Sequence, residues 1–379
     1  MKIGILTLPL HTNYGGILQA YALQTVLERM GHEVVVFQKE NRPSFCLPLW
    51  KYPFAYGKRI IKKLIVDRRI PIFEEQKNKK EYPLIRQNTN RFIQNNIHTL
   101  VVNGFYDIDL KSFDAIVVGS DQIWRPKYVD VLWHTNIQDA FLRFTKQWRG
   151  KRIAYGVSFG TDDWVYSEKD TNKCKKLLKN FDAVSVRESQ GIELCTKYLG
   201  TNPELVLDPT LLLKKDDYCS LLINSEIRNK YLFNYILDES EEKTELLNQI
   251  AATKKLELRN IRIKSTDKYA PVAERIIPPV EAWLDGIYNA EFVMTDSFHG
   301  CVFSIIFRKP FVAIANKRRG CSRFQSLFEM LGLEDHLIMD VKEYNPDKSY
   351  NIPSGVTEKL IRFQNSSIDF LRINLKYNL

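Results

Sequence analysis

One histidine in the sequence follows a buried strand and stands where a parallel sheet presents groups to a ligand. Asp296, Ser297 and His299 come directly after the apolar run at 292–295 and open a helical segment. Side chains that follow the strands of a parallel sheet lie in the crevice where ligands bind. Because imidazole titrates near neutral pH, we predict that His299 carries a proton; a core or capping histidine is the structural alternative. The other histidines lie in loops or polar stretches, at His11, His32, His98, His134 and His336.

A carboxylate follows another buried strand. Residues 119–124 (GSDQIW) come directly after an apolar run that ends at Val118. At this place Asp121 is predicted to act as a base or to bind a hydroxyl group. Ser and Asp are also favoured at helix N-caps, so a cap is the alternative for Asp121, and Trp124 is equally consistent with plain core.

An arginine follows a third apolar strand, at 183–187. The planar fork of Arg187 matches a carboxylate or phosphate. The alternative is an internal ion pair with Glu188 or Glu193. Since a buried ionic group is costly unless it is paired or used, we interpret Arg187 as an anion ligand.

Residues 13–20 (NYGGILQA) open the first predicted helix, where free backbone N–H groups and the positive end of the helix dipole face a ligand. The paired glycines permit close approach, and the polar side chains can hydrogen-bond sugar hydroxyls. A tight turn that requires glycine is the alternative. The residues that we assign to binding of such a sugar, as the acceptor of a transferred group, are Asn13, Tyr14, Gly15, Gly16 and Gln19.

A basic segment at 316–323 (NKRRGCSR) follows the strand predicted at 311–315. Four cations at a strand end would form an electropositive wall for an anionic donor. A solvated basic loop is the alternative. The candidate donor-binding residues in this segment are Arg319, Ser322 and Arg323, and Ser297 joins them from the histidine segment.

These segments lie at strand ends within an alternating α/β pattern, whose continuous apolar strands are typical of parallel sheets covered on both faces. Strands are predicted at 2–8, 33–37, 113–119, 152–158, 183–187, 231–237, 256–261, 292–295 and 311–315. We predict two Rossmann-like domains that face one another across a cleft, as in B-type glycosyltransferases. They would comprise residues 1–200 on the acceptor side and 201–350 on the donor side, with a C-terminal helix in 351–379 that packs back on the first domain.

The composition excludes several classes of protein. A net charge of +10 over 379 residues favours anionic partners, but no basic and aromatic repeat predicts a nucleic-acid binder. Neither G-x-x-x-x-G-K-[ST] nor G-x-G-x-x-G occurs, so kinases and dehydrogenases lose their usual support. The D-x-D triplet at 107–109 is common by chance, and six dispersed cysteines predict no metal site.

No apolar run reaches the ~18–20 residues that span a bilayer, and the first eight residues are predicted to form a strand instead of a signal segment. A cytoplasmic protein is therefore expected, at most peripheral at the inner membrane face. A basic amphipathic helix is predicted between Lys58 and Arg69. We expect it to contact anionic lipid, at about 1 kcal/mol per basic residue, whereas a solvated helix face is the alternative.

The order of these motifs resembles the polysaccharide pyruvyl transferase family. The resemblance rests on N-Y-G-G-x-L-Q-A, G-S-D-Q-x-W, V-S-V-R-E, L-D-P-T and D-S-F-H-G, between residues 3 and 335. It implies transfer of pyruvate from phosphoenolpyruvate to two hydroxyls of a hexose, in a bacterial exopolysaccharide, a capsule or a lipid-linked precursor.

The same resemblance implies roles for individual residues. His299 would be the acid/base, Arg187 the donor-binding arginine and Arg319 a second cation near the donor, with no metal or other cofactor. Many members carry Arg two residues before the histidine. Here Ser297 stands at that position, so that one anion contact of the family is unfilled.

Two other functions fit the same architecture. A B-type glycosyltransferase would use a nucleotide sugar, whose diphosphate suits the same basic wall. A non-catalytic sugar-binding protein would use the cleft without chemistry.

Overall fold

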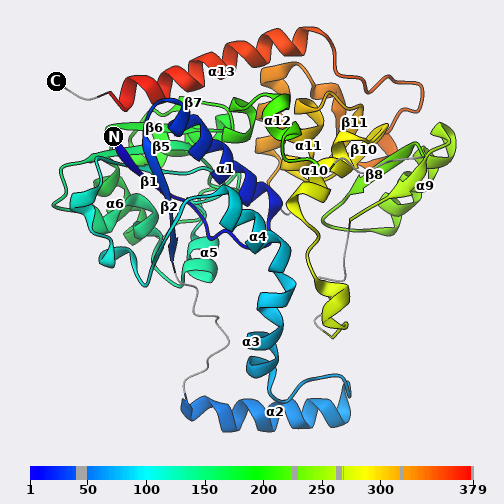
Figure 1. Ribbon diagram of the computed structural model, residues 1–379, viewed down its shortest axis with the longest axis horizontal. Coiled ribbons are helices and arrows are strands. Elements are labelled where there is room, and N and C mark those ends of the chain that lie inside the picture. Colours follow the sequence, from blue (N-terminus) through cyan, green and yellow to red (C-terminus); the bar gives the residue numbers. More distant parts are fainter. Residues whose placement is uncertain (40–48, 224–228, 262–266, 268, 316–319, 377–379) are drawn as a thin grey trace.

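The computed structural model describes residues 1–39, 49–223, 229–261, 267, 269–315 and 320–376, and it contains two parallel β-sheets flanked by helices (Figure 1). The first sheet has the strand order β3-β2-β1-β4-β5-β6-β7, and all of its pairings are parallel. Its strands are β1 (Lys2–Leu6), β2 (Glu33–Lys39), β3 (Thr99–Val102), β4 (Ala115–Val118), β5 (Lys151–Val157), β6 (Ala183–Val186) and β7 (Glu204–Leu205).

The second sheet has the order β12-β11-β10-β8-β9 and is also parallel. Its strands are β8 (Tyr231–Tyr235), β9 (Glu257–Arg259), β10 (Phe292–Thr295), β11 (Phe311–Ile314) and β12 (Leu337–Ile338). The inner strands β10 and β11 are apolar and wholly buried, as expected where helices cover both faces of a sheet. The predicted α/β class with two Rossmann-like sheets is therefore confirmed.

Helices occur between the strands of both sheets and after the last strand. They are α1 (Tyr14–Arg29), α2 (Tyr52–Ile65), α3 (Glu74–Ile85), α4 (Gln87–Asn96), α5 (Pro126–Tyr128), α6 (Glu168–Leu178), α7 (Ser189–Leu194), α8 (Lys215–Cys219), α9 (Glu241–Lys254), α10 (Val280–Tyr288), α11 (Phe298–Ile306), α12 (Ser322–Leu331) and α13 (Gly355–Asn374). Every residue of α11 is buried, since this helix packs between the second sheet and the first half of the chain.

The strand order places one switch point in each sheet. In the first sheet the chain moves from β1 toward β3 and then returns to place β4 on the other side of β1. In the second sheet, β8 lies between β9 and β10 in the same manner. Ligands of open α/β sheets bind outside the carboxyl ends of strands at such points. The segments after β1, β4 and β10 are therefore the ones best placed to form a site.

The structure departs from the sequence predictions at several element boundaries. The short edge strands β3 and β12 were not predicted. The polar helix predicted at 73–95 is two helices, α3 and α4, and the first contains Pro83, whose missing N–H removes a helical hydrogen bond. The basic helix predicted to reach Arg69 is α2, which begins at Tyr52 with Pro53 in its first turn and ends at Ile65.

Helix α13 lies across both sheets (Figure 1). Lys151 donates to the carbonyl of Asn374 over 2.9 Å, and Ser367 Oγ accepts from the backbone N–H of Leu207 over 2.9 Å. Phe370 packs against Tyr155 with ring centroids 6.1 Å apart. The C-terminal helix thereby packs on the first sheet after the chain has completed the second.

Phe370→Ala should therefore lower the free energy of unfolding by about 3–5 kcal/mol, because a buried aromatic ring leaves a cavity between α13 and β5. Ile373→Ala on the same helix is the control, since Ile373 is exposed and its truncation should cost less than about 0.5 kcal/mol. Urea unfolding of both variants makes the comparison. Equal losses would show that α13 is not held by its buried face.

Candidate functional site

A buried cluster of ionic side chains joins the two halves of the chain at these strand ends. Asp121 follows β4, Arg187 follows β6 and Asp208 lies three residues after β7. From the second half, His299 lies in the first turn of α11 and Arg323 in the first turn of α12. All five side chains are buried. Residues that are far apart in the sequence are thus gathered at one place.

Asp208 is the centre of this cluster. Its Oδ2 accepts a hydrogen bond from Nη1 of Arg187 and lies 3.7 Å from Nε2 of His299. Its Oδ1 accepts from the N–H and hydroxyl of Thr210, at 3.0 and 2.6 Å. The imidazole of the second half and the guanidinium of the first therefore converge on a carboxylate of the protein itself.

Arg187 is held by carboxylates on more than one side. Its Nη2 donates to Oδ1 of Asp121 over 3.0 Å, and its Nε lies 3.8 Å from Oε2 of Glu188. Burial lowers the pKa of Arg187, but attraction to Asp208, Asp121 and Glu188 outweighs burial and raises it above its ordinary value. Of the two ion pairs considered from the sequence, the one with Glu188 is present, whereas Glu193 is exposed and is not among the described partners of Arg187; the closest partners are Asp208 and Asp121.

A second cation lies close to Arg187. The guanidinium carbons of Arg187 and Arg323 lie 4.9 Å and 5.6 Å, respectively, from the centroid of the Phe298 ring. Burial, followed by repulsion from Arg187, lowers the pKa of Arg323 to about 10. Two buried guanidinium groups thus lie against one aromatic ring.

The carboxyl groups of the cluster differ in their protonation. Burial alone would raise the pKa of Asp208 and of Asp121, but attraction to Arg187 and then His299 holds both below their usual range. For Glu188, burial outweighs the attraction of Arg187 and raises the pKa. The two aspartates are therefore charged at neutral pH and fix the guanidinium of Arg187 between them.

The start of α1 packs directly against His299. A Cβ atom added to Gly15 would lie 2.0 Å from Nδ1 of His299 and 2.4 Å from its Cγ. Only glycine permits this approach. The glycine predicted to admit a ligand thus admits the imidazole, and the first helix of one half is fitted to the histidine of the other.

The polar residues of the same segment have separate environments. Asn13 is exposed, and its side chain makes no cap hydrogen bond to α1. The hydroxyl of Tyr14 donates to the carbonyl of Pro278 over 3.0 Å, and its ring stacks on Trp283. Tyr14 therefore joins the two halves of the chain.

Gln19 holds the loop that carries Asp121. Its Oε1 accepts from the N–H of Ser120 over 2.8 Å, and its Nε2 donates to Thr7 Oγ1 and the carbonyl of Gly16, both over 2.9 Å. Asp121 has a φ of +56°, a left-handed conformation that costs a non-glycine residue roughly 1–2 kcal/mol. The bonds of Gln19 are among the contacts that hold this conformation.

A cavity of about 260 Å³ opens at the switch point of the first sheet, beside the cluster. It contains four of the predicted residues, together with His11, which was set aside as a loop histidine, and the neighbouring Lys127 and Tyr128. Burial and then the charge of Arg86 lower the pKa of His11 to about 4, so this imidazole is neutral at pH 7. The sequence signal that could have identified it is its place in the loop after β1, at the switch point. The predicted residues that line the cavity are Asn13, Gly16, Gln19 and Asp121.

The remaining predicted residues lie on the side of the second half. Ser297 caps α11 by accepting from the N–H of Gly300 over 3.4 Å. Ser322 begins α12 and is half-buried. Arg319 lies outside the described residues. Asp208 belongs to the L-D-P-T motif and was not predicted as a site residue, although an aspartate that follows a strand is the same signal that identified Asp121.

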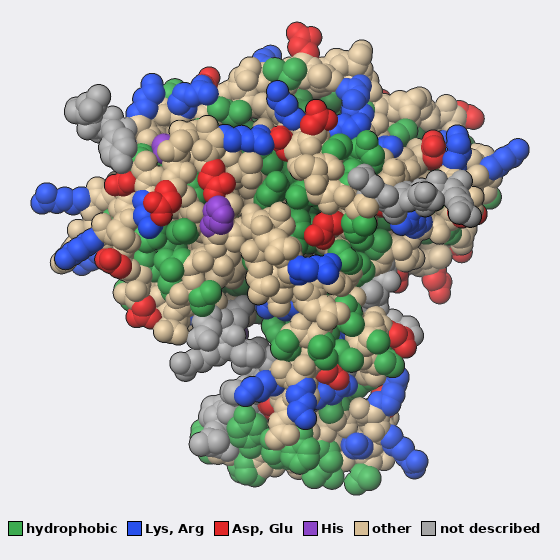
Figure 2. All heavy atoms as spheres, viewed as in Figure 1, with side chains coloured by type: hydrophobic (Ala, Val, Ile, Leu, Met, Phe, Trp, Pro, Cys, Tyr) green, Lys and Arg blue, Asp and Glu red, His purple; other side chains and the backbone are tan. Residues whose placement is uncertain are grey.

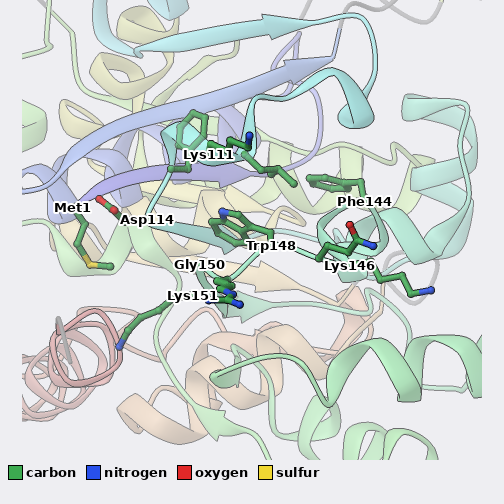
Figure 3. Close-up of a pocket in the computed structure, with 12 residues that line it drawn as sticks. Met1, Lys111, Asp114, Phe144, Lys146, Trp148, Gly150 and Lys151 are labelled. Carbon is green, nitrogen blue, oxygen red and sulfur yellow. The ribbon is translucent and has the colours of Figure 1, made fainter. Parts of the chain in front are cut away.

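A larger cavity, of about 910 Å³, lies at the opposite edge of the first sheet. Figure 3 shows Met1, Asp114 and Gly150 at this cavity, and these residues precede β1, β4 and β5. It therefore lies at the amino ends of the strands and contains none of the predicted site residues. The geometry therefore supports a functional site at the carboxyl ends of the strands rather than at this cavity.

Within the residues that the structure describes, no three His, Cys, Asp or Glu side chains are placed to hold a metal ion.

Gly15→Ala should destabilise the fold by about 1–3 kcal/mol, because the new methyl group meets the buried ring of His299. Gly16→Ala is the matched control, since the atom nearest to its Cβ would be Nδ2 of the exposed Asn13 side chain, at 3.3 Å. Thermal unfolding compares the two variants. A Gly15→Ala protein as stable as Gly16→Ala would show that the ring and the helix start do not touch.

Asp208→Asn should lower the free energy of unfolding by about 3–5 kcal/mol at pH 7, because Arg187 loses a buried charged partner. The folded-state pKa of Asp208 lies below the value of 3.8 for a free side chain. Its contribution is therefore complete above about pH 4 and is lost as the pH falls further. Unfolding followed between pH 7 and pH 2 should show less acid-induced loss for Asp208→Asn than for the wild type.

Asp163→Asn, which changes an exposed carboxylate, is the control for this pH series. It should reproduce the acid dependence of the wild type. The interpretation of Asp208 would be wrong if the two variants responded to acid alike.

Comparison with solved structures finds chains that can be aligned with nearly the whole length of this one. MurG from Acinetobacter baumannii has a TM-score of 0.44 at 10% identity, over 98% of this chain and 99% of that one. A putative UDP-N-acetylglucosamine 2-epimerase from Listeria monocytogenes has a TM-score of 0.46 at 11% identity, over 96% and 94%. A UDP-GlcNAc 2-epimerase from Methanocaldococcus jannaschii has a TM-score of 0.43 at 13% identity, over 97% and 93%.

A search of curated proteins finds no significant match. The sequence profile of one family, described as polysaccharide pyruvyl transferase, matches residues 13–318. This span contains Asp121, Arg187, Asp208 and His299, the groups that meet in the buried cluster. The chain therefore belongs to the polysaccharide pyruvyl transferase family.

Proposed function

We propose that this protein transfers a pyruvyl group from phosphoenolpyruvate to two hydroxyls of a hexose, forming a cyclic ketal and free phosphate. Family membership supports the class of reaction. The observation that supports the assignment of roles is the position of His299, 3.7 Å from Asp208 and close to Arg187. An imidazole, a carboxylate beside it and a guanidinium, which are the groups that the proposed acid/base and anion-binding roles need, thus lie together.

The donor suits the cations of the cluster. Phosphoenolpyruvate carries a carboxylate and a phosphate, and both are matched by guanidinium groups. Arg187 and Arg323 are buried on the same ring, and an anion between them would relieve their repulsion. In this proposal Arg323 supplies the cation that many family members carry at the position of Ser297. Ser322 and Arg319 belong to the same donor-binding segment.

The reaction follows from these roles. His299 donates a proton to C3 of phosphoenolpyruvate, which leaves an oxocarbenium-like centre at C2. A sugar hydroxyl forms a bond to C2 and loses its proton. The C2–O bond to phosphate then breaks, and the arginines accommodate the leaving charge. The second hydroxyl bonds to C2, loses its proton and closes the ring. Two protons leave the sugar: one replaces the proton given to C3, and the other departs with phosphate.

The acceptor is proposed to enter the cavity beside the cluster. At about 260 Å³ this cavity is near the small end of the ~300–1,000 Å³ range of ligand pockets, in keeping with one sugar ring. Asn13 and Asp121 line it with polar groups that suit sugar hydroxyls, and Asp121 is proposed as the base that receives a hydroxyl proton. Gln19 and Tyr14 act by positioning the loop and the second half.

The acceptor hexose is proposed to belong to an exopolysaccharide or capsule precursor presented on a lipid at the cytoplasmic face of a bacterial inner membrane. No helix in the described part of the chain is long and apolar enough to cross a bilayer. The scheme uses phosphoenolpyruvate as co-substrate and requires neither a metal nor another cofactor.

His299→Asn should lower kcat for phosphate release by at least about 100-fold, because general acid catalysis typically contributes 10²–10⁴-fold. His134→Asn, at an exposed histidine, is the control and should keep wild-type turnover. Each protein is incubated with phosphoenolpyruvate and nitrophenyl or lipid-linked hexosides. Phosphate release is followed together with the mass of the ketal product.

Two results would contradict the proposal. Near-normal turnover by a folded His299→Asn protein would remove the histidine from the reaction. Thermal stabilisation by nucleotide sugars, with none by phosphoenolpyruvate, would instead indicate a glycosyltransferase.

A further inference from the structure

A helical arm projects from the first half of the chain and ends in α2. In Figure 1, α3 leads away from the body and α2 lies across its outer end. The structure describes α2 as a 14-residue helix with no buried residue. Its residues are either exposed or half-buried along the whole helix.

One side of α2 and its flanks is strongly apolar. Phe54, Ile61 and Ile65 follow one another at intervals of seven and four residues, which places them on one face of a helix. Leu64 extends this face. Figure 2 shows apolar side chains gathered at the outer end of the projection, with basic side chains beside them. The exposed fractions are 68% for Trp50, 77% for Phe54, 59% for Ile61, 77% for Leu64, 78% for Ile65 and 72% for Val66.

The other side of α2 packs against the start of α3. Tyr56 packs edge-on against Phe73 with ring centroids 5.1 Å apart, and Arg59 makes two hydrogen bonds of 2.7 Å to Glu75. The arm is in turn joined to the second half by an ion pair of 2.6 Å between Arg275 and Glu81. The helix therefore presents its apolar face in a fixed direction, away from the body.

Two of the basic side chains predicted for this segment form ion pairs in the structure. Arg59 is paired with Glu75, and Arg69 lies beyond the helix and is paired with Asp67. The basic side chains that remain exposed around the apolar face are Lys51, Lys58, Lys62 and Arg68. Apolar side chains flanked by Lys and Arg, with aromatic residues at one end, form a surface typical of helices that lie in a membrane interface.

We propose that α2 lies in the surface of an anionic bilayer, with Phe54, Ile61, Leu64 and Ile65 inserted and the exposed cations at the lipid head groups. At 14 residues the helix is about 21 Å long, too short to span a hydrocarbon core of about 30 Å. It therefore lies parallel to the surface. This inference deepens the proposed function, on which it rests only for the lipid-linked nature of the acceptor.

The charges favour a bilayer over a second copy of the chain as the occupant of this face. A symmetric dimer would place the same surface on both partners, and the cations beside one apolar face would then meet those of the other. An anionic bilayer pairs these cations with lipid phosphates instead.

Vesicle co-sedimentation tests the proposal directly. The wild type should bind vesicles of phosphatidylcholine with phosphatidylglycerol, and Leu64→Glu/Ile65→Glu should bind at least about tenfold less. The matched control is Ile361→Glu/Ile373→Glu, which places the same charges at exposed isoleucines of α13 and should bind as the wild type does. Lys58→Gln/Lys62→Gln should bind less and depend less on salt.

The experiment also separates this proposal from the proposed function. Turnover of a water-soluble hexoside by Leu64→Glu/Ile65→Glu should equal that of the wild type, because α2 does not contribute to the ionic cluster. Absence of turnover in both proteins would refute the function, while vesicle binding would still support the membrane contact.

Three outcomes would overturn the membrane proposal. The first is a wild type that does not bind anionic vesicles. The second is equal loss of binding by the α13 control variant. The third is a wild type that is dimeric by analytical ultracentrifugation and becomes monomeric with Leu64→Glu/Ile65→Glu, without any vesicle binding, which would assign the face to a second copy.

Discussion

The carboxylate of Asp208 receives Arg187 from the first half of the chain and lies beside His299 from the second. All three groups are buried, so the ionic contacts among them are made away from water. A charge left in this interior without a partner would be costly. The relative position of the two sheets and the geometry of the site therefore depend on the same contact.

Several features of the fold serve this contact. Each sheet ends its strands at the interface, so that Asp121, Arg187 and His299 all follow strands. Gly15 lets α1 reach the imidazole, and Tyr14 reaches across to Trp283. Helix α13 packs on the first sheet from the end of the chain. The motifs that mark the family are thus either in the cluster or in the elements that hold it.

Much of this arrangement was predictable from the sequence. Continuous apolar runs identified the inner strands, and polar residues directly after them identified His299, Asp121 and Arg187. The edge strands β3 and β12 were missed because they are short and, in β3, largely exposed, so that no apolar run marks them. The role of Asp208 was missed because its partners lie 21 and 91 residues away, and only the tertiary fold brings them together.

For α2, the sequence showed an amphipathic helix but not which side faces solvent. Lysine and arginine were counted as the exposed groups, whereas Arg59 is turned toward Glu75 and the apolar side is uncovered. Periodicity defines the two faces of a helix, but neighbouring elements decide which face is covered. His11 was missed for a related reason: the sequence places it in a loop, and only the neighbouring elements show that it lines a cavity.

A double-mutant cycle tests the central contact most directly. His299→Asn and Asp208→Asn are made singly and together, and the free energy of unfolding is measured for all four proteins. Groups that interact across the two halves should show a coupling energy of about 0.5–3 kcal/mol. Effects that add within about 0.3–0.5 kcal/mol would contradict the account, because His299 and Asp208 would then not form one unit.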